Sequence, residues 1–310
     1  MNAAWKRWSP LLSVVIFCLA GWLLFHELRA YRWHDIRQSL SAIPTRSIVW
    51  CGLFATANYL ILIGYDLLAL RAIGQRLPLR QVAFASFTGY VASYNLGATL
   101  GGLPVRFRVY SSLGLSAVEI VRLMLMLGIT CWLGLCTLGG IVFLVDPVQV
   151  PSTLSLPIQS MRGLGGILLS VVATYVVLTA LWRKPIRVRG HEVQLPSTRM
   201  TLAQMAIATT DLMVAAACLF VLCPADMGLT YPQFLGVYLL AIVAVMLTHV
   251  PGGVGVLELV ILTMTKSPHP QALVAAMVVF RVIYYLVPLL VATLLLGLAE
   301  YRLHRPHVDR

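Results

Sequence analysis

The stretch THVPGGVGVLEL, residues 248–259, decides how this chain folds. A proline and three glycines lie in the middle of its hydrophobic sequence: Pro251, Gly252, Gly253 and Gly255. Glu258 follows shortly after them. Unpaired backbone groups at membrane depth are costly, so irregular chain survives there only inside protein or beside water. The stretch therefore predicts a helix break that lines an interior site.

A similar interruption, YNLGATLGGLPVRFRVY, occupies residues 94–110, about 150 residues earlier. Its helix-breaking residues are Gly101, Gly102 and Pro104. We call residues 94–110 the first break and residues 248–259 the second break, after their order in the chain. Two broken hydrophobic segments in corresponding positions of two halves are typical of a transporter with its binding site near the membrane midplane.

The composition is that of an integral membrane protein. Hydrophobic residues make up 59% of the chain, charged residues 11%, and the mean hydropathy is +0.86. Soluble domains carry about 25% charged residues. We expect a single polytopic domain over residues 1–310. Neither a Gly-x-Ser-x-Gly motif nor a P-loop is present, so we do not expect an enzyme.

Apolar stretches predict an all-α fold of about six complete transmembrane helices and two re-entrant hairpins. The complete spans are 10–28, 47–70, 117–145, 163–182, 201–223 and 271–299. Each is long enough to cross a hydrocarbon core of roughly 30 Å. Four shorter stretches remain, at about 81–97, 104–115, 232–249 and 254–265. They pair into two hairpins whose tips are the two breaks.

The chain divides into two halves of opposite orientation, residues 1–155 and 156–310. Each half contains two spans, a hairpin and a third span. Because three crossings is an odd number, the second half starts on the opposite side of the membrane from the first. Inverted repeats with broken helices are common among transporters. The alternative is a duplication retained only for stability.

The net charge of +12 predicts membrane orientation rather than nucleic-acid binding, since lysines and arginines gather at helix ends. The pattern places the N-terminus, the basic loop 183–200 and the C-terminus in the cytoplasm. A cluster of arginines at 29–46 falls on the outer side and runs against this orientation.

The cysteines give no sign of a cofactor. All six fall within apolar spans, without zinc-site or disulfide spacing: Cys18, Cys51, Cys131, Cys136, Cys218 and Cys223. Buried thiols in helices behave as small hydrophobic groups. We expect neither a metal site nor a cofactor.

Arginines follow the first break at the start of its returning helix. Arg106 and Arg108 lie where unpaired N–H groups give a helix partial positive charge, which attracts phosphate or carboxylate. The arginine guanidinium also suits bidentate phosphate contact. We therefore expect an anion site here. The alternative is that both side chains extend to the cytoplasmic interface.

Glu258, after the second break, needs a cationic partner at membrane depth. If the two hairpin tips meet, that partner is Arg106; the competing partner is Arg281. One face of the last helix carries a cation, two phenols and a proline at which we predict a kink. These residues are Arg281, Tyr284, Tyr285 and Pro288. A purely structural salt bridge is the alternative. Asp211, Asn58 and Asp66 are weaker candidates, because each side chain could simply bond a neighbouring helix. We expect His249 to hydrogen-bond a helix end.

Three ordered motifs resemble the transmembrane flippase-type domain of the lysylphosphatidylglycerol synthase family. They are SYNLGATLGGLPVRFRVYSSLGLSAVEI, LTHVPGGVGVLELVIL and AAMVVFRVIYYLVPLL, and the resemblance spans most of residues 45–298. The family includes bacterial inner-membrane relatives, so the resemblance implies a multi-pass inner-membrane protein. Its recurring motif positions fall here on Arg106, Arg108, Tyr110, Pro251, Gly252, Gly253, Glu258, Arg281 and Tyr285.

The resemblance implies translocation of an anionic or aminoacylated phospholipid between leaflets, with membrane phospholipid as the partner. Bifunctional members carry a large C-terminal synthase domain, whereas this sequence ends at Arg310, so we do not expect aminoacyl transfer. The alternative is a membrane subunit or accessory of a separately encoded lipid-modifying enzyme, such as a lysylphosphatidylglycerol synthase.

Overall fold

The fold is helical in the computed structural model, which describes residues 41–147, 161–182, 186–188, 191–193, 196–248, 250–265 and 270–304. Six helical segments there have the length and composition to cross a membrane: Thr45–Ala72, Ala117–Val145, Met161–Leu181, Thr198–Phe220, Tyr231–Thr248 and Pro270–Ala299. Five coincide with predicted spans. The predicted span 10–28 lies outside the described residues. The helix over Tyr231–Thr248, which we predicted as a hairpin arm, is also long enough to cross.

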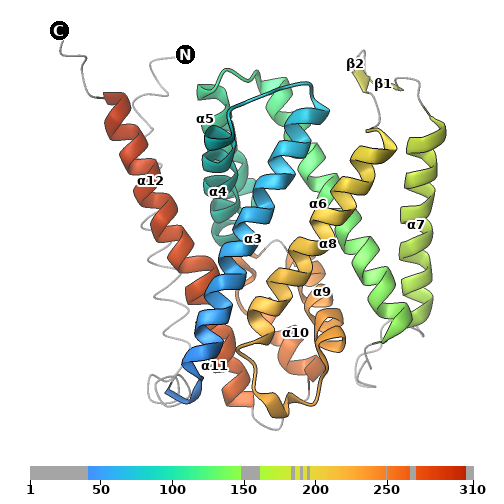
Figure 1. Ribbon diagram of the computed structural model, residues 1–310, viewed down its shortest axis with the longest axis vertical. Helices are drawn as coiled ribbons and strands as arrows, with labels where there is room; N and C mark the ends of the chain where they lie inside the picture. The colour runs from blue at the N-terminus through green and yellow to red at the C-terminus, as the bar shows by residue number, and fades with distance from the viewer. Residues whose placement is uncertain are drawn as a thin grey trace.

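The described elements follow one another in a simple order (Figure 1). They are α3 (Thr45–Ala72), α4 (Leu79–Leu96), the π-helical turn η1 (Ala98–Gly102), α5 (Leu103–Ser112), α6 (Ala117–Val145), α7 (Met161–Leu181), β1 (Ile186–Val188), β2 (His191–Val193), α8 (Thr198–Phe220), the 3₁₀ turn η2 (Ala225–Met227), α9 (Tyr231–Thr248), the 3₁₀ turn η3 (Pro251–Gly253), α10 (Val256–Thr265), α11 (Pro270–Arg281), the π-helical turn η4 (Val282–Leu286) and α12 (Val287–His304).

Short polar motifs start α6 and α8, the second of which follows the basic loop 183–200. Ser116 accepts a hydrogen bond from the Glu119 N–H, and the Glu119 side chain accepts one from the Ser116 N–H, so α6 begins with a capping box. Ser197 caps α8 in the same way through the Met200 N–H. Within the loop, β1 and β2 pair antiparallel, a small strand pair that an all-helical prediction leaves out.

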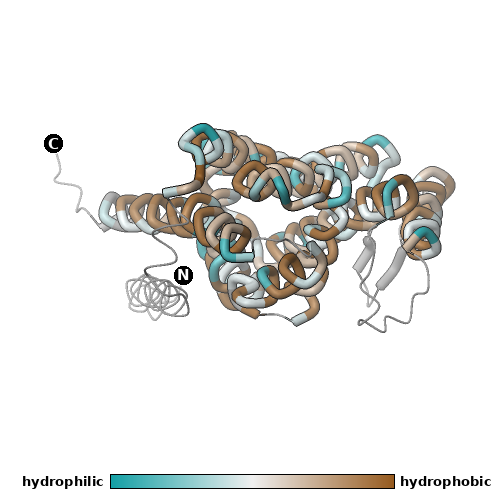
Figure 2. Tube along the Cα trace, turned by 90° about the horizontal axis from the view of Figure 1, so that it is seen from below, coloured by the Kyte–Doolittle hydropathy of each residue, from teal (hydrophilic) through white to brown (hydrophobic). Residues whose placement is uncertain are grey.

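Small residues let the central helices approach closely. A Cβ atom added to Gly134 on α6 would collide with Ala208 on α8. On α3, a Cβ added to Gly64 would lie 2.9 Å from the Ile207 side chain of α8. Close backbone approach at small residues is how helices associate in lipid. Large apolar side chains remain exposed on the outer helices, as expected of a lipid-facing exterior. In the view from below in Figure 2, hydrophobic residues predominate on the helices.

The two breaks interrupt pairs of consecutive helices. The first break joins α4 to α5 and the second joins α9 to α10, and each pair packs together. In Figure 1, α4 and α5 occupy the upper half of the molecule, whereas α9 and α10 occupy the lower half. The breaks therefore approach each other from opposite ends.

The last long helix departs from regular geometry just before Pro288, where we predicted a kink. The π-helical turn η4 separates α11 from α12. Proline has no N–H group, so the carbonyl of Tyr284 loses its usual helical donor. That carbonyl instead accepts from the Tyr59 hydroxyl at 3.0 Å, and the neighbouring Tyr285 carbonyl accepts from the Asn95 amide at 3.3 Å. Side chains of α3 and α4 thus stabilise the irregular turn.

Candidate functional site

Arg106 is enclosed between α3, α4 and α5 and is paired with Asp66. Its Nη2 atom lies 2.9 Å from Asp66 Oδ2, and its Nε atom lies 3.4 Å from Oδ1. The Tyr110 hydroxyl donates to Oδ1 at 2.6 Å. The Tyr90 ring centroid lies 4.2 Å from the guanidinium carbon. Arg106 is only 2% exposed and Asp66 is fully buried, so Arg106 does not extend to an interface.

Arg281 is the partner of Glu258, which settles the choice that the sequence left open. Its Nε and Nη2 atoms lie 2.5 Å and 2.9 Å from the two Glu258 oxygens. This bidentate arrangement is the strongest form of a charge-assisted hydrogen bond. The Tyr285 ring centroid lies 5.5 Å from the guanidinium carbon. Both charges are buried.

The Arg281–Glu258 pair also satisfies the backbone of the second break. Arg281 Nη1 and Nη2 donate to the carbonyls of Gly252 and Gly253, at 2.9 Å and 3.2 Å. Glu258 Oε2 accepts from the Gly255 N–H at 2.9 Å. These three glycines have φ angles of 67°, 61° and 78°, which favour glycine. The buried ion pair thus holds an irregular backbone that would otherwise lack partners.

The second break lies directly against the C-terminal end of α4, beside the first break. A Cβ atom added to Gly252 would lie 3.5 Å from the Asn95 carbonyl oxygen and 3.8 Å from that of Tyr94. Gly97, with φ of 85°, then ends α4. The two predicted breaks therefore meet. His249, which we expected at a helix end, lies outside the described residues.

The first break is shaped by close packing. A Cβ atom on Gly101 would collide with the Ala92 carbonyl oxygen, and one on Gly102 would collide with the Ser93 hydroxyl. Pro104 follows in the first turn of α5, where its missing N–H costs nothing. Arg108 is partly buried on the same helix. Because these glycines have no side chain, η1 can pack closely against α4, and α5 then places Arg106 beside Asp66.

Asp211 of α8 forms a third buried polar centre. Its Oδ1 atom accepts from the Asn58 amide at 2.7 Å, and its Oδ2 atom accepts from the Tyr65 hydroxyl at 2.7 Å. The Asn58 amide also donates to the Asp211 backbone carbonyl at 2.9 Å. The Tyr284 hydroxyl donates to Asn58 Oδ1 at 2.5 Å. Asp211 is therefore tied through α3 to η4, immediately after Arg281.

Tyrosine rings connect the two ion pairs. Tyr90 and Tyr94 lie four residues apart on α4, with ring centroids 6.0 Å apart. Tyr94 lies 6.1 Å from Tyr285 by the same measure. A continuous path thus runs from Arg106 through three tyrosines to Arg281. Our sequence analysis missed Tyr90 and Tyr94, although their spacing of four within α4 places both on one helix face.

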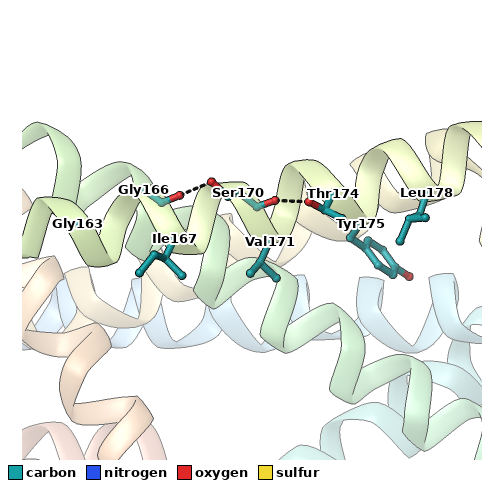
Figure 3. A pocket seen from close by; sticks show the side chains of 8 residues that line it. All are labelled: Gly163, Gly166, Ile167, Ser170, Val171, Thr174, Tyr175 and Leu178. Atoms are coloured by element: carbon teal, nitrogen blue, oxygen red, sulfur yellow. Dashed lines mark hydrogen bonds between the residues drawn. The ribbon is translucent and has the colours of Figure 1, made fainter. Parts of the chain in front are cut away.

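Two hollows lie away from this centre. A groove of about 690 Å³ follows α7, where the Ser170 and Thr174 hydroxyls donate to the carbonyls of Gly166 and Ser170 (Figure 3). The residues that line it carry no charge, so it offers no anion site. A second hollow of about 650 Å³ lies beside the start of α8 and includes Arg71 and Arg199. The predicted site residues line neither hollow.

Spanning helices that enclose compensated charges define a multi-pass membrane protein with an interior polar site. No protein-family model matches the chain. The chain belongs to the family of the inner membrane protein YbhN, and it is homologous to the membrane part of phosphatidylglycerol lysyltransferases.

Three relatives define this homology. The protein slr0712 of Synechocystis is 34% identical over 308 residues, which cover 97% of this chain and 96% of the relative. YbhN of Escherichia coli is 31% identical over 299 residues, 96% of this chain and 93% of the relative. Phosphatidylglycerol lysyltransferase of Staphylococcus xylosus is 24% identical over 297 residues, which cover 94% of this chain but only 34% of the enzyme.

Proposed function

We propose that this protein moves an anionic or aminoacylated phospholipid between the two leaflets of a bacterial inner membrane. The observation that carries the proposal is the meeting of two helix breaks beside buried arginines. Broken helices that converge inside a membrane protein are the usual way to build a substrate site at membrane depth. Homology to the membrane part of phosphatidylglycerol lysyltransferases points to the same class of substrate.

The headgroup phosphate exchanges with a carboxylate in this proposal. Arg106 and Arg281 are each compensated at rest, by Asp66 and Glu258. Opening either pair exposes a guanidinium suited to bidentate phosphate contact. Arg108, Tyr110 and Tyr285 flank these arginines and complete the proposed headgroup site, while the acyl chains remain in the bilayer.

The two helix pairs act as re-entrant hairpins of an inverted repeat. Their placement at opposite ends of the molecule supports this arrangement (Figure 1). Arg71 near the end of α3, Arg80 at the start of α4 and Arg199 at the start of α8 favour a cytoplasmic location for those ends. Impermeant thiol labelling of His191→Cys in a cysteine-free protein tests the orientation. Labelling from outside intact cells contradicts it.

Leaflet exchange in liposomes tests the proposed function. Purified protein is reconstituted with fluorescent phosphatidylglycerol, and an impermeant quencher reports the fraction in the outer leaflet. Wild-type protein should speed exchange, whereas Gly253→Leu should abolish it, because the added side chain meets Val245 at a φ of 61°. Gly128→Leu on α6 is the matched control, since a Cβ there has no neighbour within 4 Å among the described residues.

The lysyltransferase homology also favours a second candidate, an accessory role for a separately encoded lipid-modifying enzyme. In that case the protein raises the yield of modified lipid when the synthase is present and leaves leaflet exchange unchanged. The same liposomes, with and without a synthase, separate the two functions. Exchange without the synthase supports translocation.

A further inference from the structure

Three carboxylates are buried in the described helices, and Asp211 differs from the other two. Asp66 and Glu258 each contact an arginine. Asp211 is 7% exposed, and among the described residues its side-chain oxygens accept only from the neutral Tyr65 hydroxyl and Asn58 amide. Within the described part of the chain, no arginine or lysine forms an ion pair with it. When Asp211 is ionised, its carboxylate thus has two neutral hydrogen-bond donors among the described residues and no cationic partner there.

This difference decides which carboxylate can exchange a proton. A proton on Asp66 or Glu258 would leave a buried arginine without its counter-charge, which is strongly unfavourable. A proton on Asp211 removes a buried negative charge and strands nothing. Asp211 can therefore alternate between two charge states at a smaller energetic cost than either paired carboxylate. Ionisable groups of this kind inside membrane proteins mark proton relays.

The titratable groups around Asp211 are mostly phenols. Tyr65 on α3 contacts it directly. Within electrostatic range of it are Tyr90 and Tyr94 on α4 and Tyr284 in η4, as well as Cys131 on α6 and Tyr238 on α9. On α7, neither Arg162 nor Tyr175 hydrogen-bonds to it. On α11, Arg281 is held by Glu258 and two carbonyls. The surroundings of Asp211 thus leave its charge uncompensated.

We propose that Asp211 is a proton-binding site that couples lipid movement to the proton gradient; this rests on the proposed function. A proton from water binds a carboxylate oxygen, converting the carboxylate to a neutral acid. If the proton binds Oδ2, that oxygen becomes a donor and the Tyr65 hydroxyl becomes an acceptor. Asn58 links the other oxygen to Tyr284, three residues beyond Arg281. Protonation of Asp211 thereby changes a hydrogen-bond chain that ends three residues from the Arg281–Glu258 ion pair, which stabilises the second break.

Infrared difference spectroscopy tests proton binding without any lipid transport. Wild-type protein titrated with acid should gain C=O absorption from its protonated carboxyl groups, and Asp211→Asn should lack one component of that band. Asp226→Asn, in the turn η2, is the control and should keep it. Tyr65→Phe retains the carboxylate but removes one donor, so the band should appear at higher pH. An unchanged acid-induced band in Asp211→Asn overturns the proton site.

Liposomes with an imposed pH gradient test the coupling. Phosphatidylglycerol exchange by wild-type protein should become faster in one direction and reverse when the gradient is reversed. Asp211→Asn should exchange lipid at the same rate with or without the gradient. Wild-type exchange that ignores pH but follows a sodium gradient overturns the proposal. If wild-type protein shows the band but moves no lipid, the proposed function fails while the proton site stands.

Discussion

Each of the two breaks joins two consecutive helices that pack together, but the breaks are stabilised in different ways. At the second break, three glycines adopt positive φ angles, and the Arg281–Glu258 pair forms hydrogen bonds directly with their backbone groups. At the first break, Gly101 and Gly102 pack against α4, and Arg106 reaches away to Asp66 on α3. One buried ion pair therefore holds a loop, whereas the other holds two helices together. The comparison teaches that similar breaks in the sequence can place their charges in different structural roles.

Removing the charge of Glu258 should have the largest effect on the second break. Glu258→Gln removes the carboxylate that compensates the buried charge of Arg281, and breaking a buried pair costs about 3–5 kcal/mol. Unfolding in detergent, followed by helical circular dichroism, measures the loss. The double variant Glu258→Gln with Arg281→Gln should recover much of the stability without recovering lipid exchange. A double variant as unstable as the single one would contradict the role of the stranded charge.

Removing the charge of Arg106 should destabilise the α3–α5 contact while leaving the second break intact. Arg106→Gln strands the fully buried Asp66, at a cost that also approaches about 3 kcal/mol, reduced by the Tyr110 hydrogen bond. Adding Asp66→Asn should restore stability. Double-mutant cycles in the same unfolding assay give the coupling energy. A coupling below about 0.5 kcal/mol, as found for exposed pairs, would contradict a buried pair.

Glycine substitutions should separate the two kinds of break. Gly101→Ala forces a methyl group against the Ala92 carbonyl and should cost about 1–3 kcal/mol. Gly252→Ala meets only the movable Val254 side chain, at 3.3 Å, but must adopt a left-handed backbone, so its cost should be closer to about 1 kcal/mol. Thermal unfolding of both variants ranks them. The reverse order would show that the left-handed backbone at the second break costs more than the close packing at the first break.

The smallest expected effect concerns the irregular turn before Pro288. Tyr59→Phe removes the hydroxyl that donates to the Tyr284 carbonyl and should cost about 1 kcal/mol. Tyr94→Phe is the control, since its ring contacts remain and no hydrogen bond to its hydroxyl is present in the described structure. Unfolding midpoints of the two variants make the comparison. Equal midpoints would mean that the turn does not depend on Tyr59.

Much of this architecture could be predicted from the sequence. Composition and span length predicted five of the long helices, and glycine and proline predicted both breaks. Arg281 was one of two predicted partners for Glu258, because both charges lie at membrane depth and need compensation. Helical spacing also placed Arg281 and Tyr285 on one face.

The partner of Arg106 could not be predicted in the same way. Asp66 lies 40 residues away on α3, and their contact depends on how α5 folds back along α4. That path is set by the packing of Gly101 and Gly102, which no periodicity reveals. Asn58 and Asp66 were predicted only as weak candidates for the same reason. Side chains that bridge helices acquire their roles from tertiary contacts.

Cross-linking of the two breaks tests most directly whether their meeting forms the path of the lipid. Asn95→Cys and Gly252→Cys are introduced together in a cysteine-free protein and joined by a short bis-methanethiosulfonate linker. The linker suits this pair because the two backbones are close: a Cβ at position 252 lies 3.5 Å from the Asn95 carbonyl oxygen. The pair Asn95→Cys with Gly128→Cys serves as the control. Our account predicts that the linker joins the first pair and stops phosphatidylglycerol exchange, and that a reductant, which cleaves the linker, restores exchange. A cross-linked protein that exchanges lipid at the uncross-linked rate would contradict the account.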